Sequence, residues 1–151
     1  CMLFGNFLGK RGALLIACFN LFLSLFFSYV IFYEVVLSHS ICLIDCGTWI
    51  VSGFLHVKWG FLFDSLSCTM LVVINTISFL VHIYSISYMS EDPHIVRFFS
   101  YLSLFTFFML TLISSDNFLQ MFLGWEGVGL SSYLLISFWF TRLEAVKCSL
   151  K

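Results

Sequence analysis

Long apolar runs separated by short polar breaks dominate the chain from one end to the other. Four of the runs are long enough to cross a hydrocarbon core of about 30 Å as helices of about 20 residues. The runs are continuous and lack the alternation that is typical of strands, so the pattern predicts helices. The four predicted spans are residues 13–33, 61–88, 97–113 and 117–140.

The connections between these spans differ in length and chemistry. Residues 34–59 form a long, polar-leaning segment with Gly47 and Gly53, which we predict to be a loop. Pro93 lies where a new helix would begin. Residues 114–117 predict a tight turn that is rich in residues suited to an N-cap. The expected fold is therefore all-α, with the chain forming one partial membrane domain over residues 1–151.

Composition places this domain in a lipid environment. The chain is 61% hydrophobic and 10% charged, whereas a soluble domain is about 45–50% apolar and about 25% charged. The net charge of −1 and the absence of a basic stripe give no reason to expect a nucleic-acid partner. We therefore predict a polytopic membrane protein whose first partner is the lipid bilayer.

The basic residues predict how the chain is oriented in the membrane. With four spans, only Lys58 falls on one side, and all other basic residues fall on the opposite side. The positive-inside rule places that basic side, with the C-terminus, in the cytoplasm or in the mitochondrial matrix. The basic residues on this side are Lys10, Arg11, Arg97, Arg142, Lys147 and Lys151.

Glu126 is the most informative residue, because it lies in the middle of the fourth predicted span. A carboxylate at the centre of a bilayer costs about 2.5–3.5 kcal/mol on insertion scales. A membrane carboxylate with a movable cationic partner can alternate between protonated and ionised forms, which is what a proton relay requires. We predict that role for Glu126. The alternative is an acid that only bonds a neighbouring helix.

Small residues surround this carboxylate. Gly124, Gly127 and Gly129 flank it, and Ser131 follows Gly127 at a spacing of four. Small side chains let membrane helices approach closely or leave room for water. We expect these four residues to serve helix packing around Glu126.

Three other titratable residues are candidates for a proton pathway. His82 lies inside the second span, where a ring can pass protons or can simply bond a hydroxyl on an adjacent helix. Asp64 and Asp116 lie near span starts, where an acid favours the helix N-terminus. Asp116 also precedes Glu126 by ten residues, which is about 15 Å of helix.

Other chemistry is missing from the sequence. There is no phosphate-binding loop, no nucleophile–base pair and no Cys/His metal spacing. Cys42 and Cys46 could pair in an oxidising compartment, but their spacing matches no strong metal or redox signature, so the sequence favours free thiols. All lysines and arginines lie in loops or at span edges, so Glu126 has no evident cation in its own chain.

Several segments resemble a known family. They are GWEGVG within residues 122–136, WGFLFDSL at 59–66, YSISYMSEDPH at 84–94 and FWFTR at 138–142. The chain is similar in these segments to the chain five family of respiratory NADH–ubiquinone oxidoreductase (complex I), in its N-terminal part. By this resemblance the four spans correspond to helices two to five of an antiporter-like helical bundle.

The resemblance implies a function. Members of this family translocate protons in the membrane arm of a mitochondrial inner-membrane enzyme, driven by ubiquinone reduction elsewhere. It implies that NADH, FMN, iron–sulfur clusters and ubiquinone are bound by other subunits, with no cofactor or metal in this chain. The glutamate that matches Glu126 pairs, in the family, with a lysine on a later helix. The expected partners are the other membrane-arm subunits.

The resemblance also predicts that this chain is not a complete pump. The remaining helices would come from a second chain of a split subunit, or the chain is a fragment. Two other function classes stay open. One is a non-catalytic four-helix scaffold or assembly subunit. The other is a membrane enzyme or quinone-binding module, for which only His82 with Tyr84 gives a hint.

Overall fold

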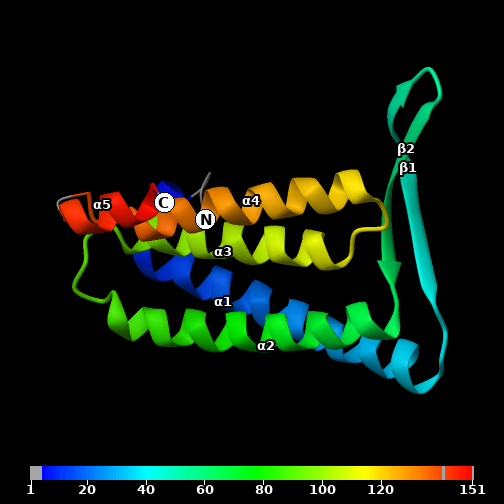
Figure 1. Ribbon diagram of the computed structural model, residues 1–151. Coiled ribbons are helices and arrows are strands. Elements are labelled where there is room, and N and C mark those ends of the chain that lie inside the picture. Colours follow the sequence, from blue (N-terminus) through cyan, green and yellow to red (C-terminus); the bar gives the residue numbers. More distant parts are fainter. Residues whose placement is uncertain (1–4, 141, 151) are drawn as a thin grey trace.

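The computed structural model describes residues 5–140 and 142–150, with side chains from residue 9 onward. Helices dominate, and one antiparallel hairpin interrupts them (Figure 1). The elements in chain order are α1 (Gly5–Phe32), a short π-helix η1 (Tyr33–Leu37), β1 (Cys42–Ser52), β2 (Leu55–Phe63), α2 (Ser65–Tyr88), α3 (Ile95–Ile113), α4 (Phe118–Ile136) and α5 (Leu143–Ser149).

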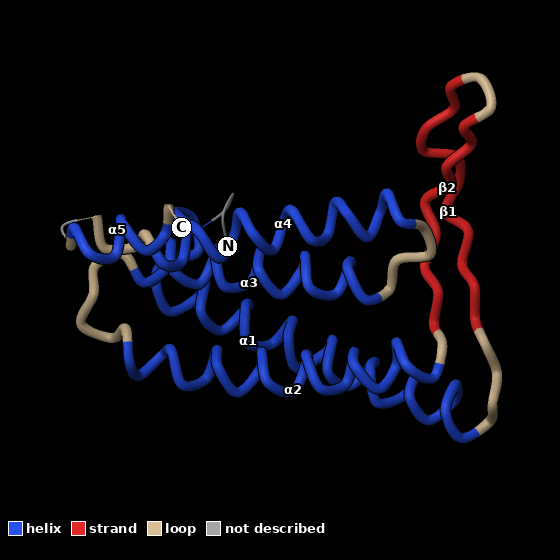
Figure 2. The backbone as a smooth tube through the Cα atoms, in the orientation of Figure 1, coloured by secondary structure: helices blue, strands red, loops and turns tan. Residues whose placement is uncertain are grey.

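The four long helices run back and forth along one common direction, with α3 between α2 and α4 (Figure 1). α4 packs chiefly on α3, while α1 packs on both α2 and α3. The hairpin lies across one end of this bundle, where α2 begins, α3 ends and α4 begins (Figure 2). We call this the hairpin end. The opposite end, where α1 and α3 begin, is called the basic end.

The hairpin corrects the prediction of a loop at residues 34–59. β1 and β2 pair antiparallel from Cys42 opposite Phe63 to Ser52 opposite Leu55. A two-residue turn joins them, with Gly53 at φ +57°, a conformation that favours glycine. The strands are rich in β-branched and aromatic residues, which favour pleated pairing, but glycines and charges among them obscured the pattern.

The hairpin also shifts the predicted span boundaries. The second span was expected from residue 61, but β2 runs to Phe63 and α2 begins only at Ser65. The third begins two residues early, at Ile95, and the fourth ends at Ile136 rather than at residue 140. In the first helix, Gly9 has φ +71° and interrupts the regular backbone before the predicted span.

Within the described residues, three helical stretches are long and apolar enough to cross a membrane, and they correspond to the first three predicted spans. The fourth, α4, has 19 residues, as α3 does, and packs along it. Glu126 and Gln120 lower its apolar content, so α4 does not belong to that set of three. The chain is therefore a mostly helical, polytopic membrane protein whose described helices are interrupted by a hairpin.

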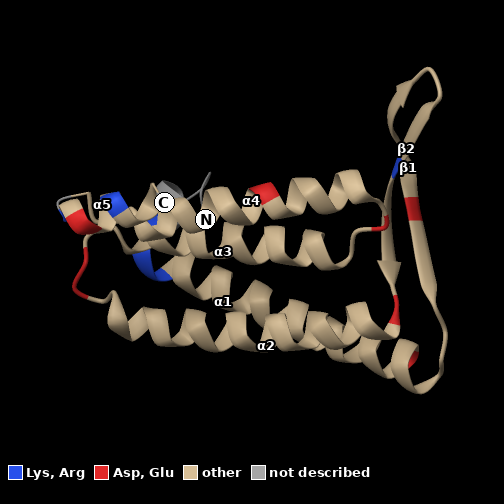
Figure 3. Cartoon of the chain, in the orientation of Figure 1, with Lys and Arg blue, Asp and Glu red and all other residues tan. Residues whose placement is uncertain are grey.

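Basic residues gather mainly at one end of the bundle, whereas acidic residues lie at both ends (Figure 3). Lys10 and Arg11 lie near the start of α1, and Arg97 lies in the first turn of α3, all toward the basic end. Lys58 lies in β2, at the hairpin end. Both Lys10 and Arg97 therefore fall on the side that the charge pattern predicted, while Lys151 lies outside the described residues.

Candidate functional site

Glu126 lies on the outward side of α4, exposed beside the aromatic residues Phe122, Trp125 and Tyr133. Trp125 is 68% exposed, so no described residue of the chain covers this face. Within the described residues, the ion pairs do not include Glu126. The arrangement is a carboxylate on an uncovered apolar helix face, positioned to meet a group from outside this chain.

The opposite face of α4 is packed closely on α3 through small residues. A Cβ on Gly124 would come within 2.8 Å of the Leu112 Cα, and one on Gly127 would overlap the Phe108 ring. Ser131 is fully buried and donates its hydroxyl to the Gly127 carbonyl oxygen at 2.9 Å. Gly129 differs, because nothing lies within 4 Å of the position of its Cβ. Two of the three glycines thus lie at the α3 contact.

Gln120 joins α4 to the hairpin. Its side chain is fully buried, and its Oε1 accepts a hydrogen bond from the Gly60 backbone N–H at 3.3 Å. Its Nε2 has no partner among the described residues. A buried donor without a partner is costly, so a water molecule or another acceptor is expected there.

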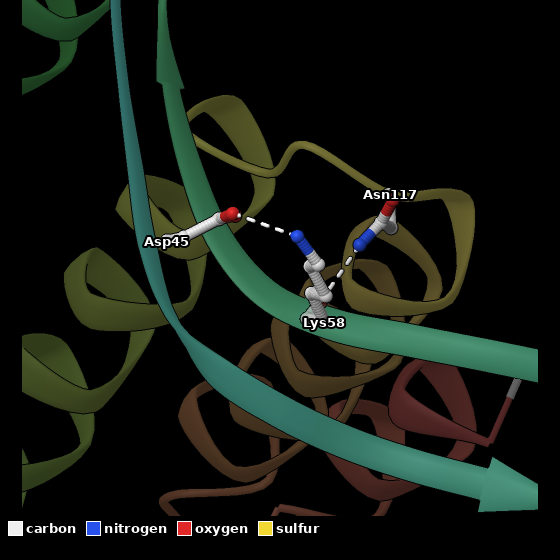
Figure 4. Close-up of polar contacts among 3 residues, drawn as sticks. All are labelled: Asp45, Lys58 and Asn117. Atoms are coloured by element: carbon white, nitrogen blue, oxygen red, sulfur yellow. Dashed lines mark hydrogen bonds and ion pairs between the residues drawn. The ribbon is translucent and has the colours of Figure 1, made fainter.

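Two more polar contacts lie near this junction, one between α4 and the hairpin and one within the hairpin (Figure 4). The Asn117 side-chain amide donates to the Lys58 carbonyl oxygen at 2.7 Å. The Lys58 ammonium pairs with Asp45 of β1 at 3.0 Å, and both side chains are well exposed. Two hydrogen bonds, with Gln120 and Asn117, thus join β2 to the start of α4, whereas the Lys58–Asp45 ion pair joins the two strands of the hairpin.

The two predicted acids at span starts lie at this end of the bundle. Asp64 occupies the N-cap position of α2, but its side chain makes no capping hydrogen bond. Asp116 precedes the N-cap of α4, and its Oδ2 lies 3.4 Å from the position of a Cβ on Gly60. Asp116 therefore lies against the hairpin, at the opposite end of the bundle from the basic end.

His82 is fully buried on α2, and its ring packs edge-on against Phe99 of α3 at 5.6 Å between centroids. Nδ1 lies 2.7 Å from the Ser78 carbonyl oxygen, so this nitrogen carries the proton and donates it. Nε2 has no partner among the described residues. His82 of α2 packs on α3, whereas Glu126 lies on the exposed face of α4, and α3 lies between these two helices (Figure 1). These two candidates therefore do not share a site.

A second polar region lies along α1. The Ser24 hydroxyl donates to the buried Asn75 side chain of α2 at 3.2 Å. Ser24 also lines a hollow of about 250 Å³ with Asn20, Ser103 and Thr106, between α1 and α3. The sequence reasoning missed Asn75 and Gln120. Amides within otherwise apolar runs are the signal that could have found them.

Metal and disulfide chemistry receive no support from the described part of the chain. No group of three or more candidate metal ligands occurs there. Cys42 and Cys46 are free and lie on the same strand, where four residues span about 13 Å. A disulfide needs Cα atoms within about 7 Å, so these two thiols are not positioned to pair with each other.

Comparisons with known proteins match most of the chain. Residues 49–99 match the family model described as NADH-Ubiquinone oxidoreductase (complex I), chain 5 N-terminus. Residues 115–151 match the one described as NADH:quinone oxidoreductase/Mrp antiporter, TM.

Curated relatives are similar over nearly the full length of this chain. NADH-ubiquinone oxidoreductase chain 5 of Marchantia polymorpha is 59% identical over 148 residues, which are 98% of this chain and 22% of the relative. The Acanthamoeba castellanii protein of the same name is 58% identical over 151 residues, which are 100% of this chain and 22% of that protein. The Arabidopsis thaliana protein of the same name is 57% identical over 148 residues, which are 98% of this chain and 22% of that protein. The chain thus spans about a fifth of the length of these relatives.

Proposed function

Because the chain belongs to the chain 5 family of NADH-ubiquinone oxidoreductase, we propose that it is part of the proton-translocating membrane arm of that enzyme. In this proposal Glu126 is the intramembrane carboxylate that accepts and releases a proton. The observation that supports it most directly is the position of Glu126 on an apolar, uncovered face of α4.

The free-energy cost of a carboxylate within a membrane helix supports this role. An acid within a membrane helix is expensive unless a partner offsets the cost, and such residues commonly mark ion or proton pathways. The ion pair of the described chain, Lys58 with Asp45, lies outside the helices. The cation that would control Glu126 therefore comes from another helix of the same subunit. The relatives are more than four times as long as this chain, which leaves ample length for it.

The same proposal specifies the partners of this chain, its location and the subunits that bind the cofactors. The partners are the other membrane-arm subunits, together with the remaining helices of this subunit on the same or a second chain. The location is the mitochondrial inner membrane, with the basic end on the matrix side. NADH, FMN, iron–sulfur clusters and ubiquinone belong to other subunits, so the chain contributes to an oxidoreductase without redox chemistry of its own.

Asp116 and His82 take different parts in this scheme. Asp116 lies at the hairpin end of α4, about 15 Å along the helix direction from Glu126, so water or further side chains must bridge that distance. His82 lies on α2, beyond α3, and would serve a separate route with its unpaired Nε2. Asp64, at the start of α2, lies where that separate route would reach the hairpin end of the bundle.

The test is the substitution Glu126→Gln in the assembled enzyme, which removes the titrating group and preserves its size. We expect proton translocation per NADH oxidised, measured in sealed vesicles, to fall strongly while the complex still assembles. Glu91→Gln is the matched control, because Glu91 lies in the exposed turn after α2. Normal pumping in Glu126→Gln would overturn the relay role.

The second candidate function is a non-catalytic scaffold or assembly subunit. The extensive packing of α4 on α3 through Gly124 and Gly127 favours it as an alternative. It predicts that Glu126→Gln changes the amount of assembled complex while the pumping per complex stays normal. Quantifying both values in the same membranes distinguishes the two functions.

A further inference from the structure

Polar residues of α1, α2 and α3 lie at a similar depth in the bundle. Ser24 lies near the middle of the apolar stretch Gly9–Leu37, which comprises most of α1 together with η1. Asn75 lies near the middle of α2, and Ser103 and Thr106 lie near the middle of α3. Each of these three stretches is long and apolar enough to cross a membrane. The polar residues are therefore placed near mid-membrane, where such residues are costly and commonly serve a function.

Tertiary contacts bring these residues to one place. The Ser24 hydroxyl donates to Asn75 Oδ1 at 3.2 Å, and Asn75 is fully buried. Ser24 also lines the hollow of about 250 Å³ between α1 and α3, where Asn20 joins it from α1 and Ser103 and Thr106 join it from α3. The rest of the lining is apolar. The hollow is thus a small polar site within the apolar part of the bundle.

The hydroxyl groups of this lining have already donated their hydrogens within the protein. Thr106 donates to the Ser103 carbonyl oxygen at 2.8 Å, and Ser103 donates to the Phe99 carbonyl oxygen at 2.8 Å. The Ser24 hydroxyl donates to Asn75. Each hydroxyl oxygen keeps lone pairs, so it can still accept a hydrogen bond. An occupant of the hollow should therefore be small and rich in donors, as water is.

The size of the hollow also suits water. A water molecule takes up about 30 Å³ in the liquid, so a hollow of about 250 Å³ admits several. The competing occupant in a membrane is a lipid acyl chain. An acyl chain offers no hydrogen bond to the Asn20 amide, and an amide placed against hydrocarbon without a partner is costly. The chemistry of the lining therefore favours water.

The hollow lies about two helical turns from His82 along the bundle. His82 of α2 packs on Phe99 of α3, and these two helices run in opposite directions (Figure 1). Seven residues back along α2 from His82 is Asn75, and seven residues forward along α3 from Phe99 is Thr106. Both steps lead toward the hairpin end and cover about 10 Å at the rise of a helix. Ser103 lies between the two levels, one turn after Phe99.

We propose that the hollow between α1 and α3 binds a cluster of water molecules at mid-membrane, and that this water exchanges protons with His82. Nδ1 of His82 holds a proton, so Nε2 is the nitrogen that can accept one, and it has no partner among the described residues. A water that gives a proton to Nε2 takes another from the next water, so the cluster is unchanged after each transfer. Asn20, Ser24 and Thr106 are positioning residues for this water. The inference rests on the proposed function, in which His82 serves a route separate from Glu126.

The first test asks whether water reaches the hollow in the assembled enzyme. Thr106→Cys is treated with 2-aminoethyl methanethiosulfonate, and the modified peptide is quantified by mass spectrometry. The reagent attacks the ionised thiol, which forms readily only in contact with water. Val73→Cys is the matched control, because Val73 lies at a similar depth on the exposed apolar surface of α2. We expect Thr106→Cys to react at least about tenfold faster than Val73→Cys.

The second test asks whether the water serves proton transfer. Thr106→Val keeps the shape of the side chain and removes its acceptor oxygen. We expect lower proton translocation per NADH oxidised at a normal amount of assembled complex, and recovery in Thr106→Ser, which restores the hydroxyl. Thr76→Val is the matched control, because the Thr76 hydroxyl also bonds its own helix, at 2.7 Å from the Val72 carbonyl oxygen, but does not line the hollow.

Two outcomes would overturn the proposal. Labelling of Thr106→Cys no faster than that of Val73→Cys would mean that lipid or another helix fills the hollow. Fast labelling with normal pumping in Thr106→Val would mean that the water takes no part in proton transfer. Ser103→Cys is the second labelling position if Thr106→Cys does not assemble. A failure here is separable from a failure of the proposed function, which the pumping of Glu126→Gln tests independently.

Discussion

Gly124 of α4 lies directly against the backbone of Leu112 in α3. A Cβ at Gly124 would come within 2.8 Å of the Leu112 Cα and 2.9 Å of its nitrogen. Backbone atoms cannot move aside as the end of a flexible side chain can, so this contact sets how closely the two helices approach. Glu126 follows two residues later on the other side of α4, and its placement depends on this contact.

We therefore expect Gly124→Ala to lower the free energy of unfolding by about 1–3 kcal/mol, the usual cost of overpacking. Thermal unfolding of the purified chain in detergent measures it. Gly129→Ala is the matched control, because nothing lies within 4 Å of its Cβ position. That control should be neutral or stabilising by about 0.5–1 kcal/mol, since alanine favours a helix. Equal behaviour of the two variants would argue against the close contact.

Gln120→Leu should loosen the hairpin on α4. The substitution removes the acceptor of the Gly60 N–H, and a hydrogen bond of this kind contributes about 0.5–1.5 kcal/mol. We expect faster hydrogen–deuterium exchange at the Gly60 amide. Asn117→Ala is the comparison, with a smaller effect because its bond to the Lys58 carbonyl is exposed. Unchanged exchange at Gly60 would mean that other contacts hold the hairpin.

His82→Phe separates packing from proton transfer at the centre of the bundle. The new ring can pack on Phe99 as the imidazole does, and the buried unpaired Nε2 is removed. We expect normal assembly and reduced proton pumping per NADH oxidised. His94→Phe, in the exposed turn before α3, should change neither. Full pumping by His82→Phe would assign His82 to packing alone.

Lys58→Met should have little effect on stability. The Lys58 and Asp45 side chains are 59% and 43% exposed, and exposed ion pairs contribute about 0–1 kcal/mol. The bond from Asn117 goes to the Lys58 carbonyl oxygen, which the substitution keeps. A fall of thermal unfolding temperature comparable to that of Gly124→Ala would contradict this expectation.

Much of the fold could be predicted from the apolar runs. Three predicted spans correspond to helices that can cross a membrane, and the fourth corresponds to α4. The resemblance to the chain 5 family, drawn from GWEGVG and the other segments, is confirmed by the comparisons. The hairpin was missed because Gly47, Gly60 and Lys58 interrupt its apolar alternation, so its pattern resembled that of a loop.

The sequence by itself determined the environment, the helical class and the presence of an acid within α4, because these follow from the order of apolar and charged residues along the chain. Only the tertiary structure decided which face that acid occupies. Gly124 and Gly127 have no side chains, so they admit α3 on one side and turn Glu126 outward. It also decided that His82 packs on Phe99 of α3 while Glu126 stays on the exposed face of α4, since such neighbourhoods depend on packing between distant segments.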